Sequence, residues 1–290
     1  MPQFINALFV IVFLVMPAIP LSAQIFHSDP AMAEQLIPRP VGYDTLDGAR
    51  MEFIYEQTDV DTVLSRAKTN SYILQVGREL TLYGDYMAYR VDSACNAMNW
   101  QVTHATFDSI FSLYPSGQMP DFLYDTRADL FKVHERYLFD VYLYEDSTAH
   151  FDWTLLPDTT TVCGYLCRKA EATFRGIGWT AWYAPDIPMS FGPWKLKGLP
   201  GLVLWAYDDK GTHDIKLISA RRGNNSPIAF KRAGCFRMKR ERVRKLMEKN
   251  KTSPASYKSL TGLSVSHADG NGNPRPLPVK RKFYVPYELE

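Results

Sequence analysis

Apolar and polar residues alternate with a period of two along much of the chain. In "MEFIYEQ", for example, Met51, Phe53 and Tyr55 alternate with Glu52 and Glu56. Similar segments follow at a spacing of roughly 8–12 residues, which is typical of strands joined by turns: "SYILQVG", "ELTLYGDYMAYRVD", "DLFKVHE", "RYLFDVYLYED", "AHFDWTL", "TTVCGYLCRKAEATF", "IGWTAWYAP", "GLVLWAYDD" and "HDIKLISA". The pattern predicts a mainly β (α+β) fold built on a large curved antiparallel sheet, of which a half-barrel is one form.

Helical periodicity is confined to three short segments. Residues 92–100 and 106–113 lie between the early strands, and residues 239–250 follow the last one. In the third segment Val243, Leu246 and Met247 form a narrow apolar stripe among charged residues. We therefore expect a few short helices and one basic helix near the C-terminus.

The strand predicted in "GLVLWAY" is apolar on both faces. Leu202 and Leu204 point to one side, whereas Val203, Trp205 and Tyr207 point to the other. A strand of this kind is covered on both sides, so it is predicted to lie centrally in the sheet or to line a pocket.

The N-terminal stretch is typical of an export signal. Residues 7–16 form an apolar run of signal-peptide length, and Leu21-Ser22-Ala23 offers a cleavage site before Gln24. The first six residues carry no Lys or Arg, so an uncleaved membrane anchor is the alternative. We expect residues 1–23 to be a signal peptide, the protein to be periplasmic or secreted, and no membrane span to remain after cleavage.

The rest of the chain, residues 24–290, is predicted to form a single β-rich domain. Within it, residues 262–278 have the composition of a flexible loop, and residues 279–290 are predicted to be a tail that docks on the sheet.

Charge narrows the class of partner. The net charge of +2 argues against a nucleic-acid-binding protein, which would be far more basic. Residues 221–251 nevertheless contain twelve Lys or Arg against two Glu. This segment is either a solvated surface or a contact for anionic lipid head groups or an acidic partner.

The four cysteines all follow the predicted cleavage site. An even number in an exported chain is compatible with two disulfides among Cys95, Cys163, Cys167 and Cys235. On one straight strand Cys163 and Cys167 would be too far apart to bridge, so any bridge would join them to Cys95 or Cys235. Four small buried thiols are the alternative.

Motifs of known catalytic or metal sites are absent. The six histidines show no metal-ligand spacing, and a nucleophile elbow, a P-loop and a dinucleotide fingerprint are missing. We therefore predict no catalytic residue, no metal and no cofactor, and lean against an enzyme. The segment 178–209 holds four of the six tryptophans beside several carboxylates, so an aromatic-lined hydrolase is a minor alternative.

Two neighbouring motifs in this segment have different predicted roles. Gly198, Pro200 and Gly201 are predicted to form a type II turn that leads into the strand at Leu202. The preceding "GPWKLK" is less easily explained by core packing, so residues 186–198 are the candidate binding lip. The candidate ligand- or partner-binding residues are Trp182, Asp186, Trp194, Lys195, Lys197 and Trp205.

The segment "CRKAEATFRGIGWTAWYAPDIPMSFGPWKLKGLPGLVL" resembles the signature of the GLPGLI family of exported Bacteroidetes proteins. The motif itself stands here as Gly198 to Val203, with Val203 in place of the final Ile. One departure is Ile177, where the family pattern has a second Arg. The resemblance implies an exported, β-rich domain of uncharacterised activity and supplies no catalytic residue.

We therefore expect a non-catalytic binding or carrier protein for a lipid or a hydrophobic peptide, because an apolar sheet face without catalytic groups suits such a ligand. The alternative is an envelope assembly protein that contacts a protein partner through the 186–198 lip and the basic helix.

Overall fold

The computed structural model describes most of the chain: residues 33–39, 43–114, 120–137, 140–147, 149–231, 233–252, 266–268, 274–276 and 282–289. The predicted signal peptide, residues 1–23, lies outside the described residues.

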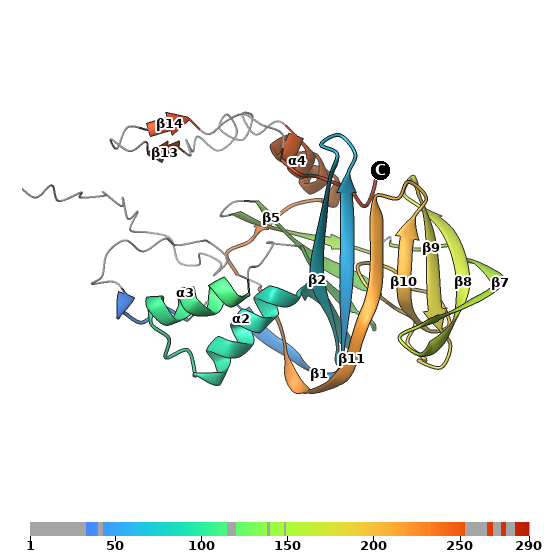
Figure 1. The fold of residues 1–290 in the computed structure, drawn as a ribbon, viewed down its shortest axis with the longest axis horizontal. Helices are drawn as coiled ribbons and strands as arrows, with labels where there is room; N and C mark the ends of the chain where they lie inside the picture. The colour runs from blue at the N-terminus through green and yellow to red at the C-terminus, as the bar shows by residue number, and fades with distance from the viewer. Residues whose placement is uncertain are drawn as a thin grey trace, which may run out of the picture.

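A large open sheet dominates the described part of the chain (Figure 1). Its twelve strands run in the order β12-β6-β5-β4-β3-β2-β1-β11-β10-β9-β8-β7, and only the β12–β6 pair is parallel. The strands are β1 (Tyr43–Asp61), β2 (Arg66–Val76), β3 (Leu80–Asp85), β4 (Asp121–Asp125), β5 (Leu130–Tyr137), β6 (Asp140–Asp146), β7 (Thr154–Val162), β8 (Tyr165–Phe174), β9 (Ile177–Ala184), β10 (Leu202–Asp208), β11 (His213–Lys231) and β12 (Phe236–Arg237). The predicted mainly β class with a curved, nearly antiparallel sheet is confirmed.

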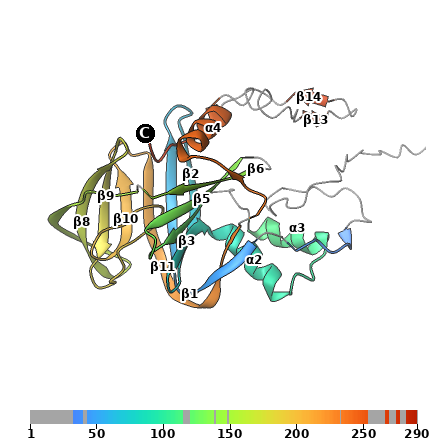
Figure 2. The ribbon, with the colours of Figure 1, turned by 180° about the vertical axis from the view of Figure 1, so that it is seen from behind.

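The curvature is built into the two longest strands. β1 and β11 pair over their whole length, and their register shifts at three places along β1, the first between Thr45 and Asp47. Such bulges bend a strand and increase its twist. From behind, β5 is seen to run across the direction of β2, as a strongly curved sheet requires (Figure 2).

Three helices are described: α2 (Tyr86–Ala97), α3 (His104–Leu113) and α4 (Arg240–Thr252). The prediction of a strand through residues 79–92 is wrong beyond Asp85. The Asp85 carboxylate accepts hydrogen bonds from the N–H groups of Met87 and Ala88, and this cap starts α2 directly after β3. None of the helices in the described part of the chain is long and apolar enough to cross a membrane.

The remaining short strands, β13 (Ser266–Ala268) and β14 (Pro274–Pro276), pair antiparallel with each other. They fall within residues 262–278, the predicted flexible loop. The rest of that loop lies outside the described residues.

The predicted two-sided strand is confirmed at its start, whereas Trp205 and Tyr207 farther along are half-buried. β10 lies between β9 and β11, and Leu202, Val203 and Leu204 are fully buried. Large aromatic side chains such as Trp179 and Tyr55 pack in the same buried cluster. The core therefore lies against the inner face of β8 to β11 and β1 to β6.

The cysteines do not form disulfides: all four are free thiols. Cys95, Cys167 and Cys235 pack in three different apolar clusters, so they lie apart. Cys163 is also not on one strand with Cys167, because it lies in the turn between β7 and β8 with φ of 49°. The structure therefore has the free thiols that were the alternative to disulfides, although only Cys95 and Cys167 are fully buried.

Candidate functional site

The predicted binding lip, residues 186–198, is buried in the part that contains its two lysines. Trp194 is 3% exposed, Lys195 0% and Lys197 9%. The prediction of an exposed lip is therefore wrong for residues 192–197. The segment folds inward because Trp194 packs on Trp179, with ring centroids 5.1 Å apart, and because Lys195 finds carboxylates in the interior.

Lys195 lies at the centre of a buried ion cluster. Its Nζ donates to Oδ2 of Asp146 at 2.8 Å and to Oε1 of Glu288 at 2.5 Å. Arg175 donates two hydrogen bonds of 2.8 Å to Asp146 and one of 2.7 Å to Glu288. Arg240 adds a hydrogen bond of 2.6 Å to Glu288. Three cations thus converge on two carboxylates.

The cluster gathers residues from elements far apart in sequence. Asp146 ends β6, and Arg175 lies with Gly176 in the turn between β8 and β9, where both residues have positive φ. A two-residue turn with positive φ at both positions matches the twist of a hairpin. Arg240 is the first residue of α4, and Glu288 belongs to the segment 282–289, which we call the C-terminal segment.

The ion pairs control the pKa values in the cluster. Burial alone would raise the pKa of Glu288, but attraction to Lys195 and Arg175 outweighs it and holds this pKa below its usual value. The pKa of Asp146 is lowered in the same way against burial, by hydrogen bonds from Arg175 and by Lys195. Both carboxylates are therefore ionised at neutral pH.

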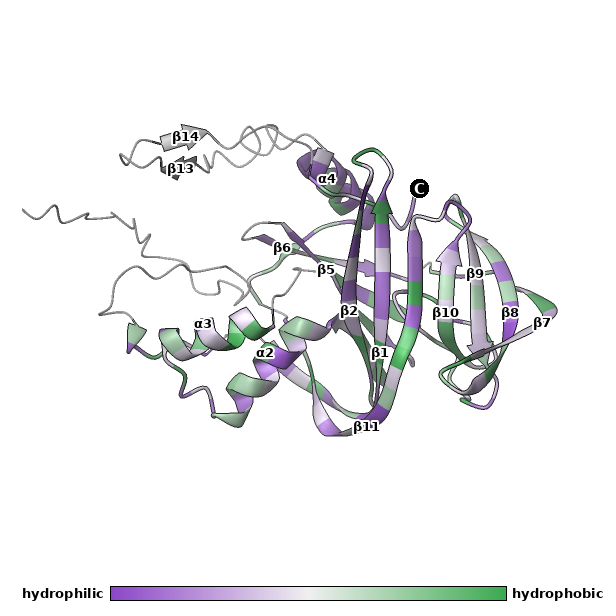
Figure 3. Ribbon diagram, viewed as in Figure 1, coloured by the Kyte–Doolittle hydropathy of each residue, from purple (hydrophilic) through white to green (hydrophobic). Residues whose placement is uncertain are grey.

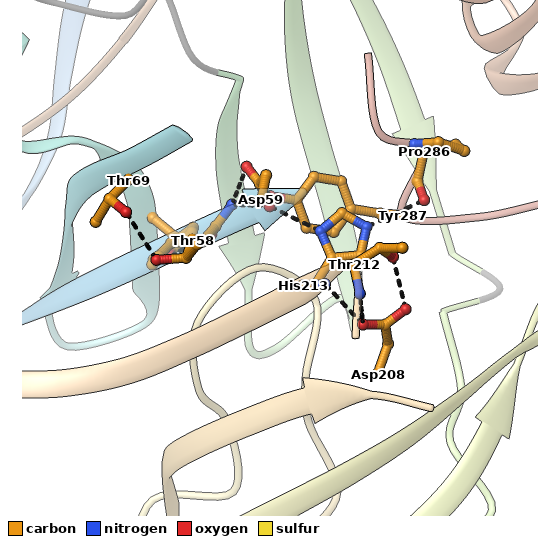
Figure 4. Close-up of polar contacts among 10 residues, drawn as sticks. Thr58, Asp59, Thr69, Asp208, Thr212, His213, Pro286 and Tyr287 are labelled. Atoms are coloured by element: carbon orange, nitrogen blue, oxygen red, sulfur yellow. Dashed lines mark hydrogen bonds and ion pairs between the residues drawn. The ribbon is translucent and has the colours of Figure 1, made fainter. Parts of the chain in front are cut away.

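Tyr287 fills an aromatic site next to the ion cluster. Its ring stacks on His213 with centroids 4.0 Å apart and packs on Trp194 at 5.2 Å. Figure 4 shows Tyr287, His213 and Asp59 meeting at this point. Because β1 and β11 pair Asp59 with His213, these two residues lie opposite each other on neighbouring strands.

Polar contacts hold the ring system together. Nδ1 of His213 lies 2.7 Å from Asp59, and its Nε2 lies 3.1 Å from the carbonyl oxygen of Pro286. The Tyr287 hydroxyl donates to Asp59 at 3.2 Å and accepts a hydrogen bond from Gln57. Both nitrogens of His213 are therefore engaged, and neither is directed at a nucleophile.

A hollow of about 540 Å³ lies beside the C-terminal segment. Seven of its lining residues are Lys or Arg and three are Asp or Glu, while the others include Phe122, Tyr144 and Met247. Part of the wall is α4, which is mostly hydrophilic along its length (Figure 3) and turns Val243 and Met247 inward. The hollow therefore has apolar surface and an excess of positive charge.

Two arginines that line the hollow have an unused donor. Nε of Arg136 and Nε of Arg244 are buried and lack a hydrogen-bond partner in the described part of the chain. A buried donor without a partner is costly, so these two arginines are the residues of the lining with an unmet need for an acceptor.

The other candidate residues lie away from this site. Trp182 and Trp205 are half-buried and face each other across β9 and β10, with centroids 6.0 Å apart. Trp205 donates to Asp214 at 2.9 Å. Asp186 is exposed. The structure therefore brings Trp194 and Lys195 to the site. Lys197 instead pairs with Asp129, and its ammonium lies over the Tyr124 ring.

The "GLPG" motif makes a tighter turn than predicted. The N–H of Gly201 donates to the carbonyl of Leu199 at 2.9 Å, whereas the N–H of Leu202 donates to Ile187. The hydrogen bond therefore spans three residues centred on Pro200 rather than the four of a type II turn. A Cβ on Gly201 would lie 2.3 Å from the carbonyl oxygen of Ala184, so only glycine fits there.

Sequence reasoning missed most of the charged partners at the site. Asp146 and His213 carry no local motif, and Arg175 lies in the family-like segment without an assigned role, because the partners of all three are distant in sequence. For the tail the sequence predicts only docking on the sheet, although "YELE" also places an aromatic residue directly before a carboxylate. Among the described residues no three His, Cys, Asp or Glu side chains come together in a way that would hold a metal ion.

Comparison with known proteins adds a partial family match. Residues 175–205 match a Bacteroidetes-associated family described as "Protein of unknown function (Porph_ging)". No curated protein matches the chain.

Similar solved structures include "Structure of PNGF-II in P21 space group", with a TM-score of 0.47 at 12% identity, covering 70% of this chain and 34% of that one. The C2 crystal form of PNGF-II gives a TM-score of 0.46 at 13% identity, with 70% and 33% coverage. This chain thus spans about a third of the length of those structures.

Proposed function

We propose that the chain is an exported, non-catalytic binding or carrier protein of the GLPGLI type, periplasmic or secreted. Its ligand combines an apolar body with an anionic group, as a fatty-acid-like lipid or an acidic hydrophobic peptide does. The observation that carries this proposal is the hollow beside the C-terminal segment, whose lining combines aromatic and aliphatic side chains with seven Lys or Arg, among them Arg136 and Arg244, whose Nε donors have no partner among the described residues. Its volume is in the range of small-molecule sites.

The alternatives have less support. An assembly protein that uses residues 186–198 as a lip would need Lys195 and Lys197 at the surface, and both are buried. A hydrolase would be centred on Asp186. This residue is exposed, and it is not one of the residues that line the hollow.

The test is a fluorescence titration with 11-(dansylamino)undecanoic acid, an apolar probe with one carboxylate. We expect the acid to bind at least about tenfold more tightly than its methyl ester, because a charge-assisted hydrogen bond contributes about 1.5–3 kcal/mol. Arg244→Gln should remove most of that difference. The matched control is Arg242→Gln, an exposed arginine on the same helix, which should leave binding unchanged.

Competition then identifies the source of the ligand. Oleate that displaces the probe indicates a lipid, and an acidic hydrophobic peptide that displaces it indicates a peptide. Equal binding of acid and ester, or an equal effect of both arginine variants, would overturn the proposal.

A further inference from the structure

The C-terminal segment is held in the manner of a bound peptide. It forms no strand of the sheet. Its backbone contacts lie at its two ends, where Lys282 donates to Lys251 and Leu289 donates to Arg175. Between them, Tyr284 N–H donates to the Asp61 carboxylate and the Pro286 carbonyl faces His213.

Two adjacent side chains of this segment enter two different sites. The Tyr287 ring enters the aromatic site, and its hydroxyl reaches Asp59. The Glu288 carboxylate enters the cation cluster and contacts Arg175, Lys195 and Arg240. Paired sites for neighbouring side chains of an extended chain are how proteins read short peptides.

Both sites keep internal partners when the segment is taken away. Asp146 still pairs with Arg175 and Lys195. Asp59 still pairs with His213 and still accepts from Gln57. These internal contacts do not depend on the segment, and Glu288 is the second carboxylate that Lys195 and Arg175 contact, so an incoming acid could take its place.

The hollow lies directly beside the segment. The hollow runs along residues 282–288, which form part of its lining. In sequence, residues 253–281 separate the segment from α4. Because the segment is joined covalently to the rest of the chain, it has a high effective concentration at its site. A free peptide displaces it only if its own affinity is sufficient.

We propose that the site beneath residues 282–289 is a peptide-binding site for an extended peptide with an aromatic residue followed by an acidic one, and that the chain's own Tyr287-Glu288 pair occupies it as an internal ligand. This inference names the ligand class of the proposed function. It rests on that function in one respect, namely that the ligand enters through the hollow.

The experiment keeps the full chain during folding. A recognition sequence for a site-specific protease is inserted within residues 277–281, the protein is folded and then cut, and exchange of a fluorescent peptide of residues 282–290 is followed by anisotropy. We expect the peptide to exchange into the cut protein but not into the uncut one.

Peptide variants test the recognition. Glu288→Gln and Tyr287→Ala peptides should each exchange at least about tenfold more weakly than the parent peptide. Absence of exchange, unfolding on cleavage, or equal binding of the Glu288→Gln peptide would overturn the inference. Each of these outcomes leaves the binding of the dansyl acid to the uncut protein intact, so failure here is distinct from failure of the proposed function.

Discussion

Lys195 and Glu288 are 93 residues apart in sequence, yet Nζ of Lys195 lies 2.5 Å from Oε1 of Glu288 in the interior of the protein. Lys195 is fully buried, and the side chain of Glu288 is 9% exposed. The contact joins the "GPWKLK" segment to the C-terminal segment. Any ligand or partner that moves the C-terminal segment must therefore replace this ion pair.

Removal of the central cation should destabilise the fold strongly. Lys195→Met keeps the length of the side chain but leaves Asp146 and Glu288 with one cation fewer in a buried site. Breaking a buried ion pair by removing one partner costs about 3–5 kcal/mol. Lys197→Met is the control, because its partner Asp129 is 62% exposed, and it should cost about 1 kcal/mol or less. Urea unfolding measures both, and equal losses would contradict the assigned role of Lys195.

Acid should weaken the hold on the C-terminal segment. The pKa of Glu288 is lowered from its reference value of 4.5, because Lys195 and Arg175 outweigh the effect of burial. The ionised form therefore contributes stability above about pH 4.5, and this is lost as the pH falls through the lower, folded-state value. The wild-type melting temperature should fall below this pH, and Glu288→Gln should flatten the fall.

The control for this pH dependence is Glu56→Gln, which removes the same charge from an exposed position of β1. Its pH profile should follow that of the wild type. A Glu288→Gln profile as steep as the wild-type profile would show that Glu288 does not carry the acid sensitivity.

The two glycines of the "GLPG" motif should differ in their tolerance of alanine. Gly201→Ala places a Cβ 2.3 Å from the Ala184 carbonyl oxygen, so the chain must move, and we expect a loss above about 2 kcal/mol. At Gly198 the nearest atom would be a Trp153 side-chain carbon at 3.7 Å, so Gly198→Ala should cost about 1 kcal/mol from its φ of +93° alone. Thermal unfolding gives the order, and the reverse order would contradict the observed turn.

Thiol chemistry should report four free cysteines. Burial raises the pKa of Cys95 and of Cys167 to about 11, so both should react slowly with a thiol reagent in the native state. Cys163 is exposed and should react first. The non-reduced, denatured protein should titrate with four thiols per chain, and a count of two or none would show that disulfides form.

The alternating segments predicted the sheet because strand periodicity is a local property. The two-sided strand at Leu202 was predictable for the same reason, since its neighbours in sequence show that both faces are apolar. The start of α2 was missed because Asp85 ends a strand pattern and caps a helix at the same time. A period-two pattern alone does not reveal that change.

The site was less predictable because its contacts are long-range. A lysine in a Gly- and Pro-rich segment is expected at the surface, and Lys195 is buried only because Asp146 and Glu288 reach it from distant positions. The pairing of Asp59 with His213 likewise depends on the register between β1 and β11. These relationships follow from topology, which single-sequence periodicity does not provide.

Native mass spectrometry of the protein purified from its host tests the central claim most directly. The account predicts a bound acidic lipid or peptide on the wild-type protein, retained in Arg242→Gln and largely lost in Arg244→Gln. Wild-type protein that is consistently empty, or that carries the same bound mass in both variants, would contradict a ligand-binding function for the hollow.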